Sequence, residues 1–427
     1  MLQYIFRSSK DQLLKSDLLR HNLIAHILDG AIFVFAMSFV SVQTVLPVFL
    51  RAVGGGSVAI GSVPILWTIG INLPQILFLR FTHRSGRIKH ILLRYGLLHR
   101  YLFLGLGLCT FFIVGRVDAS VTILLILTLL FLTALSGSLG MPPWLQMFVK
   151  TTPVHFRGRL IAIRQLIGSL LGVLGGALVS VILTQFSLPL NFSLLFFIAF
   201  GFSMVSYVFL RSLKEPITEG ENEFNIASEN ILQRCKIILR ADSNFRNFLI
   251  TDALLLMSMT AFVFYAVYAL NKFSLPTSSA GMFTMIMMGS MVLANVIFGF
   301  LADSFGHKLN LLFLAAATGF ASLLAVLSTN IVFFSLVFFF MGCALTIQGI
   351  SRMPFVAELC RDQDRPFYVA MSNTLTAPAV FIGIIAGVLI EYFGYAPILL
   401  SYSTFAFIGL YWLVRYVREP RLQVAKS

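Results

Sequence analysis

The chain has 427 residues, of which 58% are hydrophobic and 11% are charged, and its net charge is +14 at pH 7. Soluble domains are about half apolar and about a quarter charged, so this composition excludes an ordinary soluble protein. Apolar runs of about 20 residues, each able to cross a membrane as a helix, recur along nearly the whole chain. Because these runs do not alternate, they also exclude a β-barrel. We expect an all-α membrane protein with twelve transmembrane helices.

The 31 lysine and arginine residues are distributed by loop, which argues against a nucleic-acid partner. If the N-terminus lies inside, only Arg51, Arg116 and Lys272 fall on the outer side. The positive-inside rule then places both termini in the cytoplasm, as an even number of helices requires. We expect a multi-pass protein of the cell membrane, inner or plasma.

Motifs of enzymes and metal sites are absent from the sequence. It contains no P-loop, no HExxH and no pair of CxxC motifs. The four cysteines fall in predicted helices or cytoplasmic segments, which argues against an extracellular disulfide framework. We therefore expect no enzyme activity, no cofactor and no metal site.

The first predicted elements are a cytoplasmic tail (1–21) and a six-helix bundle (22–212). Within this bundle, four helices are expected at about 22–50, 59–80, 91–114 and 120–144, a fifth beginning just after Arg159, and a sixth at about 190–211. The fourth helix is expected to end near Met141-Pro142-Pro143-Trp144.

A cytoplasmic linker is predicted at 213–246. Its first part is acidic and polar and cannot bury a core. Its second part, from Ile231 to Leu239, has apolar residues at helical spacing, which predicts an amphipathic helix. A second six-helix bundle (247–416) and a cytoplasmic tail (417–427) follow.

The two bundles carry signs of an internal repeat. The segment from Gly299 to Lys308 reads GFLADSFGHK, and a degraded copy from Leu79 to Lys89 reads LRFTHRSGRIK. Asp252 follows Asp29 by 223 residues, each near the start of the first helix of its half. These offsets indicate an ancient duplication.

The pattern G-x-L-A-D-x-x-G-x-K between the second and third helix of a half resembles the signature loop of the major facilitator superfamily of secondary transporters. This resemblance implies two six-helix halves with a substrate near the midplane between them. It also implies that Asp303, Gly306 and Lys308 form a conformational latch at the inner face. The corresponding residues of the first half are His83, Arg84, Gly86 and Arg87, where His83 replaces the usual aspartate. Plain topology-setting charges are the alternative for both loops.

Asp29 and Asp252 are candidates for proton coupling. A carboxylate inside a transmembrane helix costs roughly 2.5 to 3.5 kcal/mol, so it usually faces a cavity or a partner. A structural ion pair near the inner surface is the alternative. Arg94, Arg100 and Arg164 are the predicted partners of Asp29, with binding of an anionic substrate as the other possible role.

Arg352 and Glu358 are predicted as a gate pair across the halves, with interfacial charges as the alternative. In the superfamily that the loop resembles, the first and fourth helices of each half line the cavity. Here these helices supply the cavity candidates Gln43, Trp144, Gln146, Tyr265, Tyr268 and Gln348. A few polar groups in an aromatic cleft suit an amphiphilic solute better than a sugar.

The sequence therefore predicts a secondary active transporter that moves a small organic solute by alternating access, driven by protons. The alternatives are a proton-independent facilitator and a non-transporting receptor or scaffold with the same fold. The expected partners are the solute, protons and membrane lipid, and we expect a monomer.

Overall fold

The computed structural model describes residues 17–82, 88–215, 231–361 and 364–421. All regular secondary structure in these ranges is helical, which confirms the all-α prediction. The helices of the first half are α2 (Asp17–Ser38), α3 (Val45–Ala52), α4 (Ser57–Thr82), α5 (Ile88–Ile113), α6 (Ala119–Thr151), α7 (Val154–Gln185) and α8 (Leu190–Ser212), and α9 (Ile231–Ala241) lies in the linker.

The second half begins with α10 (Ser243–Met259), α11 (Phe262–Phe273), α12 (Ser279–Phe305) and α13 (His307–Leu327). It continues through α14 (Ile331–Ile347), a π-helical turn (Gln348–Arg352), α15 (Met353–Glu358), α16 (Arg365–Thr376), a 3₁₀ turn (Ala377–Phe381), α17 (Ile382–Phe393) and α18 (Tyr395–Tyr416). In the described ranges, eleven helical spans are long and apolar enough to cross a membrane. The 26-residue helix α4, whose Ser57–Ile71 stretch is apolar, accounts for the twelfth expected span.

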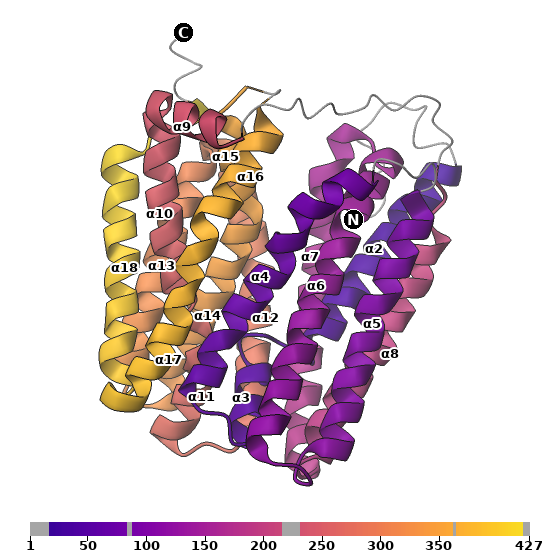
Figure 1. The fold of residues 1–427 in the computed structure, drawn as a ribbon, viewed down its shortest axis with the longest axis vertical. Coiled ribbons are helices and arrows are strands. Elements are labelled where there is room, and N and C mark those ends of the chain that lie inside the picture. The colour runs from indigo at the N-terminus through magenta and orange to yellow at the C-terminus, as the bar shows by residue number, and fades with distance from the viewer. Residues whose placement is uncertain (1–16, 83–87, 216–230, 362–363, 422–427) are drawn as a thin grey trace.

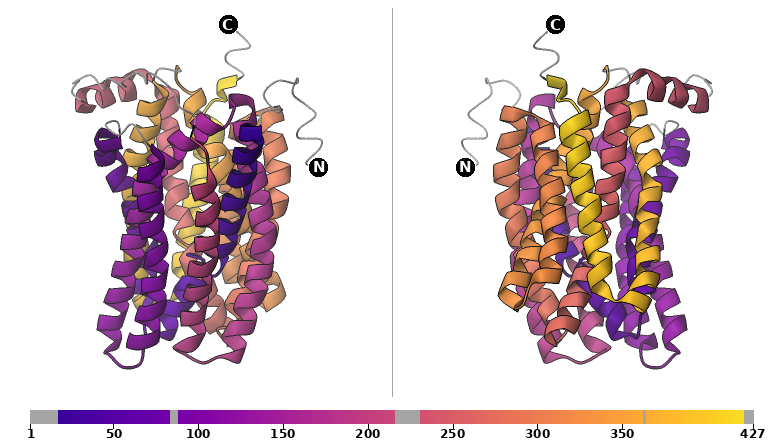
Figure 2. Two further views of the ribbon diagram at one scale, coloured as in Figure 1. Left: turned by 90° about the vertical axis from the view of Figure 1, so that its right-hand side faces the viewer. Right: turned by 90° about the vertical axis from the view of Figure 1, so that its left-hand side faces the viewer.

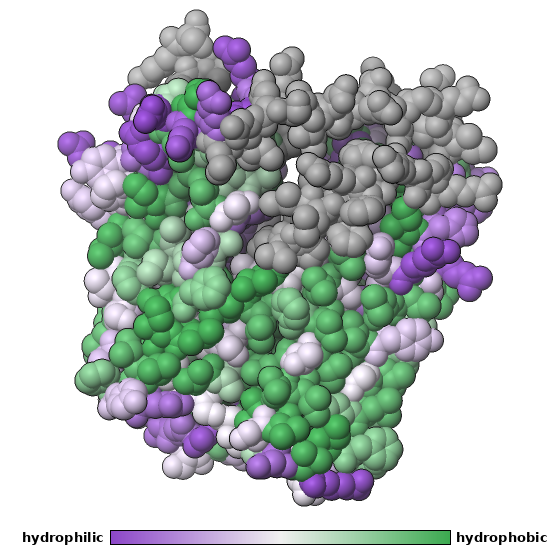
Figure 3. All heavy atoms as spheres, in the orientation of Figure 1, coloured by the Kyte–Doolittle hydropathy of each residue, from purple (hydrophilic) through white to green (hydrophobic). Residues whose placement is uncertain are grey.

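The two halves stand side by side, and both ends of the described chain lie at the same face as α9 (Figures 1 and 2). We call this face the terminal face and the other the opposite face. An apolar belt covers the middle of the molecule in Figure 3, between polar residues at its two ends. This distribution is the one expected of a protein that spans a bilayer.

The first helix of each half is interrupted rather than continuous. The first predicted helix, 22–50, divides into α2 and α3, and the equivalent helix of the second half divides into α10 and α11. At the first break the Ser38 hydroxyl donates to the Phe35 carbonyl at 2.6 Å, and at the second the Thr260 hydroxyl donates to the Met257 carbonyl at 2.7 Å. Side chains that bond nearby carbonyls compete with helix continuation. The interruption of the first helix is therefore shared by both halves and is part of the internal repeat.

Two predicted helix ends in the first half are wrong. Helix α6 continues through Pro142 and Pro143 to Thr151, and α7 begins at Val154, before Arg159. Prolines in a helix cost about 3 kcal/mol, but tertiary packing can outweigh that cost. Beyond the prolines, the side chains of Met147 and Phe148 are buried against the first half.

The halves contact each other near the opposite face through α7 with α12, α4 with α17, and α3 with α11. The Thr44 and Thr284 hydroxyls are hydrogen bonded across this contact at 2.6 Å. Glycines allow close backbone approach, as in other membrane helix pairs. Gly281 of α12 lies against the backbone of Gly176 and Ser180 in α7. We call this region the opposite-face contact.

We predict that Gly281→Ala lowers the free energy of unfolding by roughly 1 to 3 kcal/mol, because its methyl group would overlap the α7 backbone. Gly299→Ala in the same helix is the matched control, since a Cβ there meets nothing within 4 Å. Thermal unfolding of the two purified variants in one detergent measures the difference. Equal melting temperatures would show that the halves are not closely packed here.

Candidate functional site: a charged pocket and two ion-pair centres

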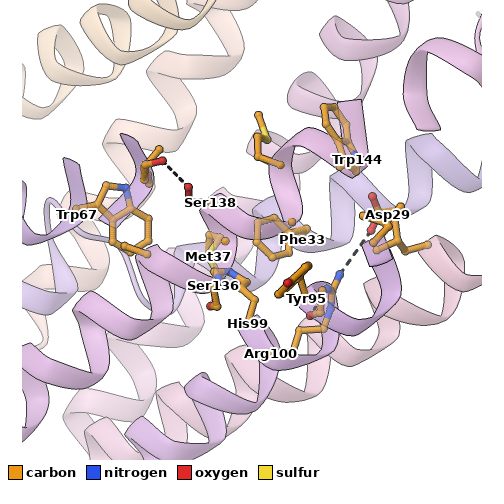
Figure 4. Close-up of a pocket in the computed structure, with 18 of the residues that line it drawn as sticks. Asp29, Phe33, Met37, Trp67, Tyr95, His99, Arg100, Ser136, Ser138 and Trp144 are labelled. Atoms are coloured by element: carbon orange, nitrogen blue, oxygen red, sulfur yellow. Dashed lines mark hydrogen bonds and ion pairs between the residues drawn. The ribbon is translucent and has the colours of Figure 1, made fainter. Parts of the chain in front are cut away.

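A pocket of about 460 Å³ lies within the first half, and we call it the first-half pocket. Its walls come from α2, α4, α5, α6, α7 and α8. The lining residues are Asp29, Phe33, Met37, Trp67, Ile71, Leu92, Tyr95, Gly96, His99, Arg100, Ala134, Ser136, Gly137, Ser138, Gly140, Met141, Trp144, Arg164 and Leu210. Figure 4 shows Asp29 and Arg100 at one end of this space and Trp67 and Ser138 at the other. The pocket is thus charged at one end and lined mainly by apolar, small and aromatic residues elsewhere.

Asp29 of α2 is the acidic group of this pocket and is only 4% exposed. One carboxylate oxygen accepts a hydrogen bond from the Ser206 hydroxyl at 2.8 Å and lies 3.7 Å from Nη2 of Arg100. The other oxygen lies 3.4 Å from Nη2 of Arg164. The predicted pairing of Asp29 is therefore present with Arg100 and Arg164. The third predicted partner, Arg94, is exposed.

Arg100 of α5 is held mainly by uncharged groups of the protein. Its Nε donates to the Ser203 carbonyl at 2.6 Å, its Nη1 to the Gly96 carbonyl at 2.7 Å and its Nη2 to the Ser206 hydroxyl at 3.0 Å. The guanidinium also lies over the Phe33 and Tyr207 rings. These contacts fix Arg100 and leave few of its donors for a ligand.

Arg164 of α7 is held less firmly. Its guanidinium carbon lies 4.9 Å from the centre of the Trp144 ring, and its hydrogen bond to Asp29 is long at 3.4 Å. Charge-assisted N–H···O bonds are usually about 2.7 to 2.9 Å. Trp144, one of the predicted cavity residues, therefore positions the more available cation of the pocket.

The second half contains a separate and tighter ion pair. Arg352, in the π-helical turn, donates from Nε and Nη2 to the two oxygens of Asp252, at 2.7 Å each. Its Nη1 also donates to Asn373 at 2.8 Å, and Nη2 contacts Thr376 at 3.3 Å. The predicted gate pair of Arg352 with Glu358 is wrong for this structure, because Asp252 of the same half takes the guanidinium.

Glu358 instead belongs to a cluster at the terminal face. It accepts two hydrogen bonds from Arg421, at 3.0 and 2.7 Å, and lies 3.7 Å from the His307 ring. The hydrogen bonds to Glu358 raise the pKa of the Arg421 guanidinium, which therefore stays charged. Arg421 also donates to the carbonyls of Ala302 and Asp303 at the end of α12.

The predicted latch residues lie around a one-residue turn, with Asp303 in the last turn of α12, Gly306 between the helices and Lys308 in the first turn of α13. Gly306 has φ +87°, which favours glycine, and a Cβ there would overlap the Glu419 carboxylate. Glu419 accepts a hydrogen bond from the backbone N–H of Lys308 at 2.8 Å, whereas the Asp303 side chain is exposed. The turn is thus held by residues that follow α18, which sequence reasoning missed.

The same arrangement occurs in the first half. Glu215 accepts from the backbone N–H of Lys89 at 3.2 Å, and Asn22 exchanges two hydrogen bonds with the backbone of Lys214. Asn244 exchanges two hydrogen bonds with the backbone of Arg418 in the same way. The sequence signal was the repeated basic-Glu-Pro triplet, at Lys214-Glu215-Pro216 and Arg418-Glu419-Pro420.

None of the five remaining predicted cavity residues lines the first-half pocket. Tyr265 is fully buried and its hydroxyl is 2.7 Å from that of Ser322, so its prediction as a cavity residue is wrong for this structure. Tyr268 stacks on Tyr395, and Gln43 lies half-buried in the break between α2 and α3.

Gln146 and Gln348 are half-buried and do not line the first-half pocket. His83, Arg84, Gly86 and Arg87 lie outside the described residues, so the first-half latch stays a prediction. Within the described ranges, no group of three or more His, Cys, Asp or Glu side chains is placed to bind a metal ion.

Fold and site together define a polytopic membrane protein of two six-helix halves with a charged pocket in one of them. Residues 248–427 match the family model of the Major Facilitator Superfamily, and this range contains the GFLADSFGHK segment. The resemblance is therefore confirmed over the second half, which matches the family model, and solved structures of transporters share the fold along nearly the whole chain. No curated protein matches the chain.

Solved structures share the fold at low sequence identity. A D-xylose-proton symporter is 12% identical with a TM-score of 0.72, covering 95% of this chain and 99% of its own. The nucleoside transporter NupG is 14% identical with a TM-score of 0.65, covering 93% and 98%. The xylose transporter XylE from E. coli, in a partially occluded inward open conformation, is 14% identical with a TM-score of 0.68, covering 95% and 99%.

We predict that Asp252→Asn and Arg352→Met each lower the free energy of unfolding by about 3 to 5 kcal/mol, since each leaves a buried group without its partner. The double variant should lose much less than the sum. Arg415→Met, at an exposed position, is the control. Additive losses in a double-mutant cycle would refute direct coupling.

We also predict that Glu419→Ala lowers stability by about 0.5 to 2 kcal/mol, because α13 loses the acceptor at its N-terminus. Hydrogen exchange of the Lys308 amide should become faster, while exchange in α14 stays unchanged. Glu391→Ala, at an exposed position near the opposite face, serves as the control. Unchanged protection of Lys308 would rule out this capping role.

Proposed function

We propose that this protein is a secondary transporter that moves a small organic solute by alternating access. The observation that carries the proposal is the first-half pocket, in which Asp29 and Arg100 are buried and Arg164 is partly buried inside membrane-spanning helices. Charges at such depth are costly and are usually associated with substrate or ion pathways. The shared fold with sugar and nucleoside transporters supports the same conclusion.

The contact between the halves supports a specific conformation. The hydrogen bond from Thr44 to Thr284 and the close glycine approaches all lie near the opposite face. With the termini in the cytoplasm, as the distribution of basic residues predicts, this is an inward-facing state. Alternating access then requires that the opposite-face contact separate while the terminal face closes.

Of the two acidic candidates, Asp29 is the better proton-coupling group. A proton on Asp252 would displace a guanidinium held by two bonds of 2.7 Å. A proton on Asp29 would release only the contacts at 3.4 and 3.7 Å. We therefore propose that Asp29 couples transport to protons and that Asp252 with Arg352 is a structural pair of the second half.

The terminal-face cluster is the proposed latch of the second half. Asp303, Gly306 and Lys308 lie at the α12–α13 turn. Glu419, Arg421 and Glu358 connect this turn to α15 and to the segment after α18. Closure of the terminal face would bring the first half against this cluster. Its hydrogen bonds would then have to rearrange, which makes it suited to stabilise one conformation over another.

The test of alternating access is a reversible cross-link across the opposite-face contact. In proteoliposomes, the double variant Thr44→Cys with Thr284→Cys should lose at least about nine-tenths of its solute-induced flux when oxidised and regain it on reduction, because a disulfide prevents the halves from separating there. Substrate-induced currents and an internal pH dye, screened against a metabolite library, provide the readout. The two single variants are the controls.

The outcomes separate the alternatives. Undiminished flux through the oxidised double variant would contradict alternating access. Flux without any pH change in the wild type, unaffected by Asp29→Asn, would indicate a proton-independent facilitator. Absence of flux for every compound would favour the receptor or scaffold, which keeps the fold without turnover.

A further inference from the structure

The charges that line the first-half pocket do not balance. Asp29 is the only acidic residue among its described lining residues, whereas Arg100 and Arg164 are both cationic. Both arginines contact the same carboxylate. One positive charge therefore remains in a buried site, and an isolated buried charge is costly unless a counter-charge or ligand compensates it.

The second half shows what a balanced centre looks like. There, one aspartate meets one arginine through two hydrogen bonds of 2.7 Å. The remaining Nη1 donor of Arg352 is bound by the Asn373 side chain. The excess of one cation is thus a property of the first-half pocket and not of both centres.

Arg164 carries the available donors. Arg100 directs Nε, Nη1 and Nη2 to the Ser203 carbonyl, the Gly96 carbonyl and the Ser206 hydroxyl. By contrast, Arg164 makes one long hydrogen bond, to Asp29, and its plane is supported by the Trp144 ring. A guanidinium supported on an aromatic ring presents a fork of N–H groups that matches a carboxylate or a similar oxyanion.

The rest of the pocket is suited to the body of such an anion. Figure 4 shows Trp67 and Met37 beyond Phe33, away from the charged end. The nearby hydroxyls of Ser136 and Ser138 are already bonded, to the Thr133 and Ile71 carbonyls respectively. Their hydrogen bonds are used within the protein, so this end of the pocket offers mainly apolar and aromatic surface.

We propose that the first-half pocket binds a monovalent organic anion, with its oxyanion on Arg164 and an aromatic or apolar body extending toward Trp67. This inference names the substrate class of the proposed transporter and rests on that proposed function. The oxyanion can belong to a free solute or to the headgroup of an anionic lipid, since the same chemistry recognises both.

The experiment compares three probes of one shape and different charge: naphthoate, naphthamide and naphthylmethylammonium. Binding to the purified full chain in a neutral detergent is measured by titration calorimetry. Naphthoate should bind about tenfold or more tightly than the amide, and the cation most weakly, because only the carboxylate pairs with Arg164. Equal affinity for all three would overturn the proposal without any variant.

Variants of opposite charge sharpen the test. Arg164→Gln should abolish the preference for naphthoate, whereas Asp29→Asn should increase it, since the lining then carries two uncompensated cations. Arg164→Lys should retain part of the preference, because it keeps the charge and loses the fork. Arg116→Gln removes an exposed charge of the same half and should change nothing. A preference that survives Arg164→Gln would overturn the assignment of the oxyanion.

Nanodiscs distinguish the two sources of anion. If naphthoate binds more weakly in phosphatidylglycerol nanodiscs than in phosphatidylcholine nanodiscs, the lipid headgroup competes for Arg164. Equal affinity in both assigns the pocket to a soluble anion. Both results support an anion site. Because binding is measured without flux, loss of charge preference in an active transporter would refute this inference alone, and charge preference without flux would refute transport alone.

Discussion

Each buried carboxylate inside the membrane-spanning helices is compensated by at least one cation. Asp29 and Asp252 lie inside membrane-spanning helices, where an unpaired carboxylate is costly, so each must be met by a cation from another helix of its half. Asp252 meets Arg352 of the tenth span, and Asp29 meets Arg100 and Arg164 of the third and fifth. Because the two aspartates are paired differently, the two halves of this repeated fold differ in the balance of their buried charges.

That difference gives the halves distinct roles in our account. The second half has a neutral, bidentate pair and a fully buried Tyr265 near its first helix break, and its own pocket of about 460 Å³ is lined by apolar residues without a charged group. The first half encloses a pocket of about 460 Å³ with loosely paired charges at one end. In this proposal, a solute and a proton bind to the first half. The contact between α7 and α12 then couples movement of the first half to the second half.

Much of the fold could be predicted because membrane-spanning helices can be recognised in a sequence by their length and apolar composition. The GFLADSFGHK segment and the spacing of Asp29 and Asp252 also indicated the repeat correctly. The partner of Arg352 could not be predicted, because it depends on a π-helical turn that rotates the side chain toward α10. Likewise, Tyr265 was predicted to lie in the cavity because the resemblance indicated which helix lines the cavity. The sequence did not show which face of that helix does so.

The residues that hold the terminal face were missed for a different reason. Glu215 and Glu419 follow the last helix of each half, where polar residues look like ordinary solvent-exposed charges. Only the structure shows that each carboxylate accepts a backbone N–H at the start of the third helix of its own half. The repeated basic-Glu-Pro triplet carried that information, and a comparison of the two halves by position could have recovered it.

Alternating access can be followed by measuring distances across the two faces with pulsed electron paramagnetic resonance. Spin labels at Ser187 and Ser274 report on the opposite face, and labels at Arg159 and Ser304 report on the terminal face, in a background without the native cysteines. We predict that a ligand or a pH change lengthens the distance across the opposite face and shortens the distance across the terminal face in the same population of molecules. Distances that stay fixed at both faces under every condition would contradict it.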